Sequence, residues 1–323
     1  MLEHRALLLE ALFFLAAAAL VAYRVKQGRP PITIATRGAA GGGRVVVREY
    51  DGHRELALAD ETGGEVLIQG RVSLTQTLVS GLPYTDGLHL GALATSRRER
   101  ALFLGGGVMI TPRQFIALYP DLTVRVAELE PEVIATAREH FFLDAHPRLT
   151  VEARDGRAAL EEAPRASLDV IIVDAFGYDA APRALASAPF FALCLERLRP
   201  GGCLVVNLAG TLAGTRGRPL RSIYAGILAT FGGASVAAFG VPLEGEHPRP
   251  GAELRGARNT VVVARKGAAL PEPEELSACA AALPLAVLPH LDAILRLRHD
   301  VDVEGLKPLN DPRPGRDDGI PVR

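Results

Sequence analysis

The sequence predicts an α/β fold in which a mainly parallel sheet carries a ligand site at one edge. Four apolar runs follow one another between Ala101 and Asp174, and stretches of helical character separate them. Strands that alternate with helices form a parallel sheet with right-handed crossovers. Each run ends in glycines or an acidic residue, and ligands of such sheets bind beyond the carboxyl ends of the strands. We therefore expect a nucleotide-type site lined by Gly105, Gly106, Gly107, Glu128, Asp155 and Asp174.

The composition describes a folded, nearly neutral protein. Its 323 residues are enough for one large domain or two modest ones, and 48% of them are hydrophobic, which excludes a disordered chain. The net charge is −1, with acidic and basic residues interleaved, so we predict no nucleic-acid partner. The three cysteines form no CxxC pair and the eight histidines show no HxH or HExxH spacing. We therefore predict no metal site.

An apolar segment near the N-terminus, Ala6 to Tyr23, predicts a transmembrane helix. Its 18 residues include one charge, Glu10, and a helix of that length spans about 27 Å, close to the roughly 30 Å of a bilayer core. A signal peptide and a buried or interfacial helix are the alternatives, although no clear cleavage site is present. Basic residues are more frequent after the segment than before it, which predicts that the bulk of the chain faces the cytoplasm. We expect an anchor over residues 1–25 and a flexible linker over 26–43.

A small antiparallel β module is predicted over residues 44–95. Its first two strands, RVVVREY and HRELALAD, are joined by Asp51-Gly52, a pair that suits a two-residue type I′ turn. A second strand pair, EVLIQG and RVSLTQTLV, is expected next. Residues 84–94 have helical spacing and lead into the parallel sheet.

The parallel sheet and its helices are predicted over residues 96–267. Helices are expected at Thr111 to Tyr119, over PEVIATAREHF, and at Leu220 to Phe231. A Pro-Gly-Gly turn opens a fifth strand that ends at Asn207, and ASVAAFGV and NTVVVARK complete the sheet as an antiparallel pair. Helices and an irregular tail follow over residues 268–323. The buried stripe expected for the second helix is Val133, Ile134, Ala137 and Phe141.

The glycine run and the acid after the next strand predict a nucleoside site. Glycines let the backbone approach a ligand and let the following helix N-terminus face it. The run GGGVMI lacks the GxGxxG pattern of dinucleotide-binding folds, which argues against NAD. Glu128 lies 21 residues after Gly107, the spacing at which such folds place an acid on ribose hydroxyls. A carboxylate suits this role because it accepts hydrogen bonds from both hydroxyls of a vicinal diol.

Two further acids stand at the ends of strands. Asp155, followed by Gly156, either accepts a hydrogen bond from an adenine amine or caps the next helix. Asp174 ends DVIIVD, the most apolar strand, where an acid has few structural duties. A functional role is favoured there over capping of the next turn. The loop that follows, FGYDAAP, contains Tyr178 and Asp179.

Five segments together resemble the spermidine synthase family, especially its membrane-associated bacterial spermidine synthase-like branch. They are LFLGGG followed by PR, VAELEPEVIATAREHF, HPRLTVEARDGRAAL, LDVIIVDAF and LRPGGCLVVN. The resemblance covers residues 44–312 and is specific from Leu102 to Asn207. It implies a Rossmann-like, class I methyltransferase-type parallel sheet with an antiparallel end strand, behind the small β module.

The resemblance also implies an activity, the transfer of an aminopropyl group from decarboxylated S-adenosylmethionine to a small-molecule amine of the polyamine class. By this likeness, Glu128 would bind the ribose hydroxyls and Asp155 the adenine amine. Asp174 would be the base for the attacking amine, and we predict Tyr84 as a second catalytic residue. The cavity for the cationic amine would be shaped by Asp174, Tyr84, Tyr178 and Asp179.

Two positions depart from the family. The acid that follows the three glycines and holds the amine of the aminopropyl group is Val108 here, and the polyamine-binding Asp is Gly177. Asp179 would replace the second acid only in a rebuilt loop. Two alternatives therefore stay open: methyl transfer from S-adenosylmethionine, whose carboxylate the absent acid would have repelled, and a membrane-tethered nucleoside-binding module without turnover. The sequence also leaves the oligomeric state open, a homo-oligomer included.

Overall fold

The computed structural model describes residues 31–39, 43–60, 66–175, 180–243, 246, 256–312 and 319–321. The predicted membrane segment, Ala6 to Tyr23, and the loop residues Tyr178 and Asp179 lie outside these ranges. Within the ranges, no helix combines the length and the apolar character needed to cross a bilayer.

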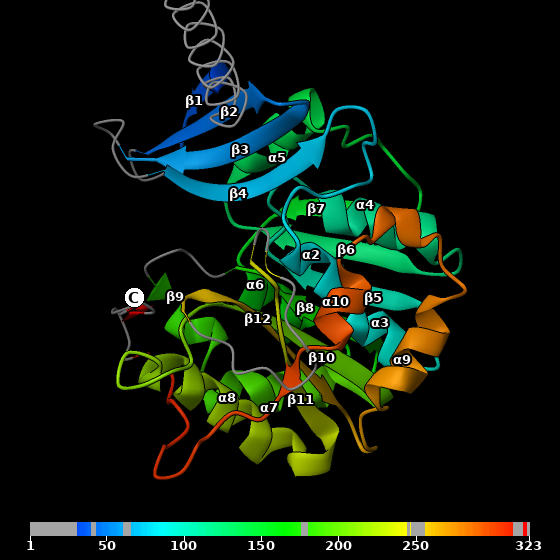
Figure 1. The fold of residues 1–323 in the computed structure, drawn as a ribbon, viewed down its shortest axis with the longest axis vertical. Helices are drawn as coiled ribbons and strands as arrows, with labels where there is room; N and C mark the ends of the chain where they lie inside the picture. The colour runs from blue at the N-terminus through cyan, green and yellow to red at the C-terminus, as the bar shows by residue number, and fades with distance from the viewer. Residues whose placement is uncertain are drawn as a thin grey trace, which may run out of the picture.

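A four-stranded antiparallel sheet forms the N-terminal module, in the order β1-β2-β3-β4 (Figure 1). The predicted type I′ turn joins β2 to β3, because Asp51 and Gly52 both have positive φ angles, 45° and 74°. The strands are β1 (Ile32–Gly38), β2 (Arg44–Tyr50), β3 (His53–Ala59) and β4 (Val66–Ser73).

Two predictions for this region are wrong. The linker expected over 26–43 contains β1, because ITIATRG is rich in β-branched residues and pairs with β2 along its length. The strand pair expected after β3 is the single strand β4. Its register with β3 shifts by one residue at Gln69, so a bulge bends the strand where a turn was predicted.

The large sheet has eight strands in the order β13-β11-β12-β10-β8-β5-β6-β7. The five strands β7, β6, β5, β8 and β10 are parallel, and β12 runs antiparallel to both β10 and β11, which confirms the predicted sheet. Every residue of β8 is buried, as expected for a central strand covered on both faces. The strands are β5 (Arg100–Leu104), β6 (Thr123–Glu128), β7 (Leu149–Ala153), β8 (Leu168–Val173), β10 (Leu198–Gly210), β11 (Val236–Gly240), β12 (Arg258–Arg265) and β13 (Arg298–His299).

Helices cover both faces of the large sheet (Figure 1). One apolar core joins the sheet to α2, α3, α4, α5, α9 and α10, and the other joins it to α6, α7 and α8. The stripe predicted for α5 is confirmed, since all four of its residues are buried. The helices are α2 (Tyr84–Gly87), α3 (Leu90–Ala94), α4 (Ile110–Leu118), α5 (Pro131–His140), α6 (Gly156–Glu162), α7 (Ala188–Arg197), α8 (Arg218–Phe231), α9 (Pro273–Ala280) and α10 (Leu291–Leu295), with 3-10 turns η1 (Arg183–Leu185), η2 (Gly233–Ser235) and η3 (Leu285–Val287).

The segment 84–94, predicted as part of the β module, packs against the large sheet. It forms two short helices, α2 and α3, which pack on β10 and β12. This packing brings Tyr84, the first residue of α2, from the N-terminal part of the chain to the large sheet.

The C-terminal part of the chain packs against α6 and pairs with a short strand that follows β8. Strand β14 (Ile320–Pro321) pairs with β9 (Ala180–Ala181), and the C-terminal end lies beside β9 in Figure 1. Asp311 forms a two-pronged ion pair with Arg157 of α6, at 2.7 and 2.9 Å.

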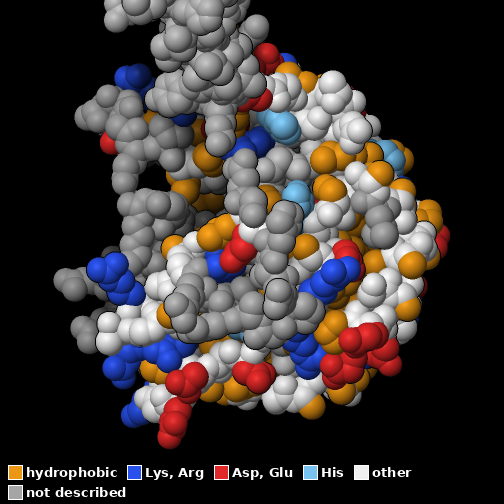
Figure 2. Space-filling model, viewed as in Figure 1, with side chains coloured by type: hydrophobic (Ala, Val, Ile, Leu, Met, Phe, Trp, Pro, Cys, Tyr) orange, Lys and Arg blue, Asp and Glu red, His pale blue; other side chains and the backbone are white. Residues whose placement is uncertain are grey.

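Over the face shown in Figure 2, acidic and basic side chains lie among one another, consistent with the small net charge.

Candidate active site

The three glycines after β5 form a tight turn at the carboxyl edge of the sheet. Gly105 and Gly107 have φ angles of +92° and +48°, values that residues with a side chain rarely adopt. A Cβ atom on Gly105 would lie 2.3 Å from the carbonyl oxygen of Asp174, and one on Gly107 would lie 2.4 Å from the carbonyl oxygen of Gln69. The turn therefore touches both the end of β8 and strand β4, so the N-terminal module forms one wall of the site.

Glu128, at the end of β6, lies against this turn. Its Oε2 atom accepts hydrogen bonds from the backbone N–H groups of Gly106 (2.9 Å) and Gly107 (3.3 Å), and its Oε1 atom accepts one from Glu130 (3.1 Å). The structure thus brings together the glycines and the acid that the sequence singled out. Of about four lone-pair positions on a carboxylate, these bonds leave one on Oε1. The next residue, Leu129, is 73% exposed and offers an apolar surface beside the carboxylate.

Asp155 caps α6, as one of its two interpretations predicted. Its Oδ1 atom accepts a hydrogen bond from the N–H of Ala158 at 2.8 Å. The side chain is exposed, and Oδ2 has no hydrogen-bond partner among the described residues, so an adenine amine can still reach it. Gly156 is buried, and a Cβ atom there would lie 3.1 Å from Cβ of Leu104. This close contact sets α6 against the end of β5.

Asp174 follows β8 and is half-buried between two hydrogen-bond donors. The hydroxyl of Tyr84 donates to Oδ2 at 3.2 Å, and Nδ2 of Asn207 donates to Oδ1 at 2.9 Å. Burial raises the pKa of the Asp174 carboxyl, the hydrogen bonds from Asn207 and Tyr84 lower it, and the charge of Glu128 raises it, with a net upward shift. Burial and the Asp174 charge also raise the pKa of Tyr84 well above its usual value, so Tyr84 stays a donor.

This arrangement can hold or deprotonate an amine. The described residues provide no cation for Asp174, so its negative charge is available to a cationic ligand. A carboxylate with a raised pKa is also a stronger base than an exposed one. The structure thus places Tyr84 and Asp174, the two residues predicted as catalytic, within hydrogen-bond distance of each other.

Asn207 and Asn259 were not predicted as site residues. Nδ2 of Asn259 donates to Oδ1 of Asn207 at 2.9 Å, so the two amides stand in line behind Asp174. The position of Asn207 at the end of a predicted parallel strand was an available signal. Asn259 offered no such signal, because it lies at the beginning of a strand that is antiparallel to β10.

Val108 occupies the position where the resemblance to spermidine synthases implied an acid in other members. It is 2% exposed and packs on Gly70 of β4, where a Cβ atom would lie 2.4 Å from Cγ2 of Val108. An apolar contact between the glycine turn and the N-terminal module thus replaces a charged group. Tyr178 and Asp179, the other predicted amine-binding residues, lie outside the described ranges.

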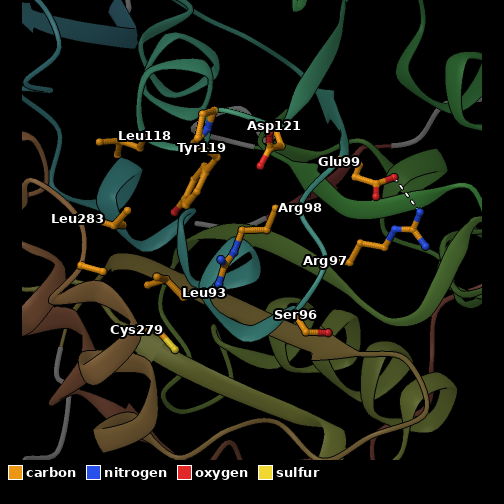
Figure 3. Close-up of a pocket in the computed structure, with 12 residues that line it drawn as sticks. Leu93, Ser96, Arg97, Arg98, Glu99, Leu118, Tyr119, Asp121, Cys279 and Leu283 are labelled. Atoms are coloured by element: carbon orange, nitrogen blue, oxygen red, sulfur yellow. Dashed lines mark hydrogen bonds and ion pairs between the residues drawn. The ribbon is translucent and has the colours of Figure 1, made fainter.

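A separate cavity of about 430 Å³ opens at the opposite, amino edge of the sheet (Figure 3). It includes none of the residues described above, and ligands of parallel sheets bind at the carboxyl edge, so we do not assign the active site to it. The cavity is lined by Leu93, Ser96, Arg97, Arg98, Glu99, Leu118, Tyr119, Pro120, Asp121, Cys279, Ala282 and Leu283.

The described residues include no cluster of three or more potential metal ligands.

The fold is shared with spermidine synthases. The structure aligns with a probable spermidine synthase from Corynebacterium glutamicum ATCC 13032 with a TM-score of 0.67 and 24% identity, over 89% of this chain and 99% of that one. The shared architecture is a Rossmann-like mixed sheet behind an antiparallel four-stranded module. No family model matches the chain.

Curated relatives are similar to part of the chain. A probable polyamine aminopropyl transferase of Bifidobacterium longum is 34% identical over 137 residues, which are 42% of this chain and 30% of that protein. Putrescine N-methyltransferase 1 of Nicotiana tabacum is 31% identical over 148 residues, 44% of this chain and 39% of that protein. The chain therefore spans less than two fifths of the length of these two relatives. The relatives thus include an aminopropyl transferase and an N-methyltransferase, each similar to less than half of this chain.

Proposed function

We propose that the protein is a spermidine synthase-like transferase, which moves an aminopropyl group from decarboxylated S-adenosylmethionine to a polyamine. The observation that carries the proposal is Asp174, which stands at the carboxyl end of β8 beside the glycine turn. Two donors orient this carboxylate and no cation of the described residues neutralises it. The similarity to the Bifidobacterium aminopropyl transferase supports the same reaction.

The reaction is a displacement at a carbon bonded to a sulfonium sulfur. The lone pair of the amine nitrogen forms the new C–N bond, the C–S bond breaks, and its electrons neutralise the sulfonium to a thioether. The nitrogen then carries a positive charge and releases a proton, which Asp174 accepts on a lone pair of its carboxylate. An enzyme accelerates such a step by holding donor and amine in line and by placing a base at the nitrogen.

The donor nucleoside would lie along the ends of β5, β6 and β7. Glu128 has one lone pair left on Oε1, so a ribose diol would share this carboxylate with the backbone groups that it already binds. The exposed Leu129 would pack against the base, and the free Oδ2 of Asp155 would accept from the adenine amine. This placement leaves the sulfonium near the glycine turn and Asp174.

A second candidate is methyl transfer from ordinary S-adenosylmethionine to the same class of amine. The buried Val108 favours it, because no carboxylate stands at this position to repel the carboxylate of the methionine part or to hold an aminopropyl amine. The similarity to putrescine N-methyltransferase supports this candidate. Both candidates use the same base and the same nucleoside.

We also propose that residues 6–23 anchor the protein in a membrane with the catalytic domain in the cytoplasm. The support is the apolar length of the segment and the basic residues that follow it. Cell fractionation with protease protection tests this proposal. A shortened, soluble chain in the periplasm would instead identify a signal peptide.

Product analysis by mass spectrometry tests the function. The purified full chain is given either decarboxylated or ordinary S-adenosylmethionine, with putrescine or spermidine as acceptor. We expect an aminopropylated amine and methylthioadenosine from the decarboxylated donor. A methylated amine from ordinary S-adenosylmethionine alone would establish the second candidate. Nucleoside binding without a product from either donor would contradict both and leave a binding module.

A further inference from the structure

Two amides, the buried Asn207 and the half-buried Asn259, stand behind Asp174. Asn207 is 5% exposed and donates from Nδ2 to Oδ1 of Asp174 at 2.9 Å, while its own Oδ1 accepts from Nδ2 of Asn259, also at 2.9 Å. Asn207 lies opposite Val261 in the register of β10 and β12, and Asn259 lies two residues before Val261. The two amides are therefore diagonal neighbours on one face of the sheet. Together with Asp174 they form one line of hydrogen bonds.

We propose that Asn259 is a positioning residue, which holds the Asn207 amide with its NH2 group toward Asp174. An asparagine amide has a donor end and an acceptor end of nearly the same shape, and rotation by about 180° exchanges them. Because Asn259 donates to the oxygen end of Asn207, the nitrogen end faces the carboxylate. In the reverse orientation two acceptor oxygens would meet, and they attract each other only when the carboxyl carries a proton.

The orientation of Asn207 thus determines how easily Asp174 loses its proton. A donor in contact with a carboxylate stabilises the ionised form. The other titratable groups of the described residues that act on this carboxyl are Tyr84 of α2, which also donates, and Glu128 of β6, whose charge opposes ionisation. Among the residues that the structure describes, Asn207 therefore supplies one of two favourable contacts, and Asn259 keeps it in place. The catalytic consequence rests on the proposed function, because a base must be free of its proton when the amine arrives.

Replacement of Asn259 by leucine tests the assignment. Asn259→Leu removes the donor, keeps the number and branching of the side-chain heavy atoms, and leaves the buried oxygen of Asn207 without a partner, which favours rotation of the amide. We expect the pKa of Asp174 to rise by about one unit, the value of a hydrogen bond to a charged group. The matched control is Thr260→Val, at the next residue of the same strand, which is 2% exposed and points to the other face. It should leave the pKa of Asp174 unchanged.

Carbon NMR of the aspartate carboxyl carbons provides the measurement, with Asp174 assigned from the signal that Asp174→Asn removes. If Asn259→Leu does not fold, Asn259→Ala serves, with the same expected shift. In an active enzyme, the low-pH limb of kcat/KM should move upward by the same amount. An unchanged pKa in a folded variant would overturn the proposal. The NMR titration needs no turnover, so its result stands even if the transferase assay finds no product.

Discussion

Two aspartates at opposite ends of β8 have opposite surroundings. Asp169, near the amino end, is 1% exposed, and its Oδ2 atom accepts from the backbone N–H groups of Glu99 (2.9 Å) and Arg100 (3.0 Å). Nη1 of Arg199 lies 3.0 and 3.1 Å from its two oxygens. Its lone pairs are thus used by backbone groups and a cation, and it joins three segments of the chain.

Asp174, just beyond the carboxyl end of the same strand, has neither kind of partner among the described residues. Its carboxylate is bound by two neutral side chains, Tyr84 and Asn207, and remains half-buried. The comparison teaches that the position of an acid on a strand does not define its role. The kind of donors around it does: backbone groups and a guanidinium make a structural acid, and neutral donors leave its charge for a ligand.

The largest expected effect is on chemistry at the carboxyl end. Asp174→Asn keeps the shape of the side chain and removes its charge and basicity. Turnover should fall by about 10² to 10⁴, the usual contribution of a positioned base, while nucleoside affinity stays nearly unchanged. Initial rates at saturating donor, together with calorimetry, measure the two quantities. A variant that keeps turnover within about threefold would show that Asp174 is not the base.

At the amino end, the matching substitution should affect stability. Asp169→Asn leaves the guanidinium of Arg199 and two backbone donors with a poorer partner. We expect a loss of about 3 kcal/mol in the free energy of unfolding, the low end for a broken buried ion pair, because Glu99 still lies 3.2 Å from Arg199. Urea unfolding measures this loss. The rate per folded molecule should not change, and a large fall in that rate would remove the contrast between the two aspartates.

A third acid, Asp86 of α2, should make stability depend on pH. It is 1% exposed, its Oδ2 accepts from the N–H of His290 at 2.8 Å, and its Oδ1 has no partner among the described residues. Burial raises the pKa of Asp86 to about 7, against roughly 3.9 in an unfolded chain. Between these values the folded state holds a proton that the unfolded state has released. The free energy of unfolding therefore falls as the pH rises through this window and is level above it.

Between pH 5 and 8 we expect a loss of roughly 2 to 3 kcal/mol from Asp86, at about 1.4 kcal/mol per pH unit up to the folded pKa. Asp86→Asn should flatten the dependence of stability on pH. The exposed Asp121→Asn is the control and should leave the slope as it is. Equal slopes in wild type and Asp86→Asn would show that this carboxyl is ionised in the folded protein throughout the range.

The sequence predicted the parts of the site that lie close along the chain. The glycine turn, Glu128 and Asp155 follow successive strands, and the parallel order of those strands places them at one edge. The capping role of Asp155 was one of two predicted alternatives, and the structure shows it. The hydrogen bonds that Glu128 accepts from the glycine turn were not predicted, because they depend on the side-chain rotamer that Glu128 adopts after the strands have paired.

The surroundings of Asp174 depend on contacts that sequence patterns do not report. Tyr84 reaches it over 90 residues and Asn207 over 33, through the packing of α2 on β12 and the pairing of β10 with β8. Tyr84 was predicted from family likeness and not from spacing. Strand β1 was missed because its flanking prolines and glycines suggested a linker, whereas pairing with β2 decided its conformation.

The smallest expected effect gives the most direct test of the central claim, that the carboxyl edge of the sheet binds an adenosyl thioether. Calorimetry with methylthioadenosine should detect binding that Glu128→Ala weakens by at least about 1.5 kcal/mol, the low end for a hydrogen bond to a charged group. The neighbouring Glu130→Ala, which removes the acid that caps α5, is the matched control and should bind like wild type. Equal affinity in Glu128→Ala and wild type, or no binding by wild type, would contradict the claim.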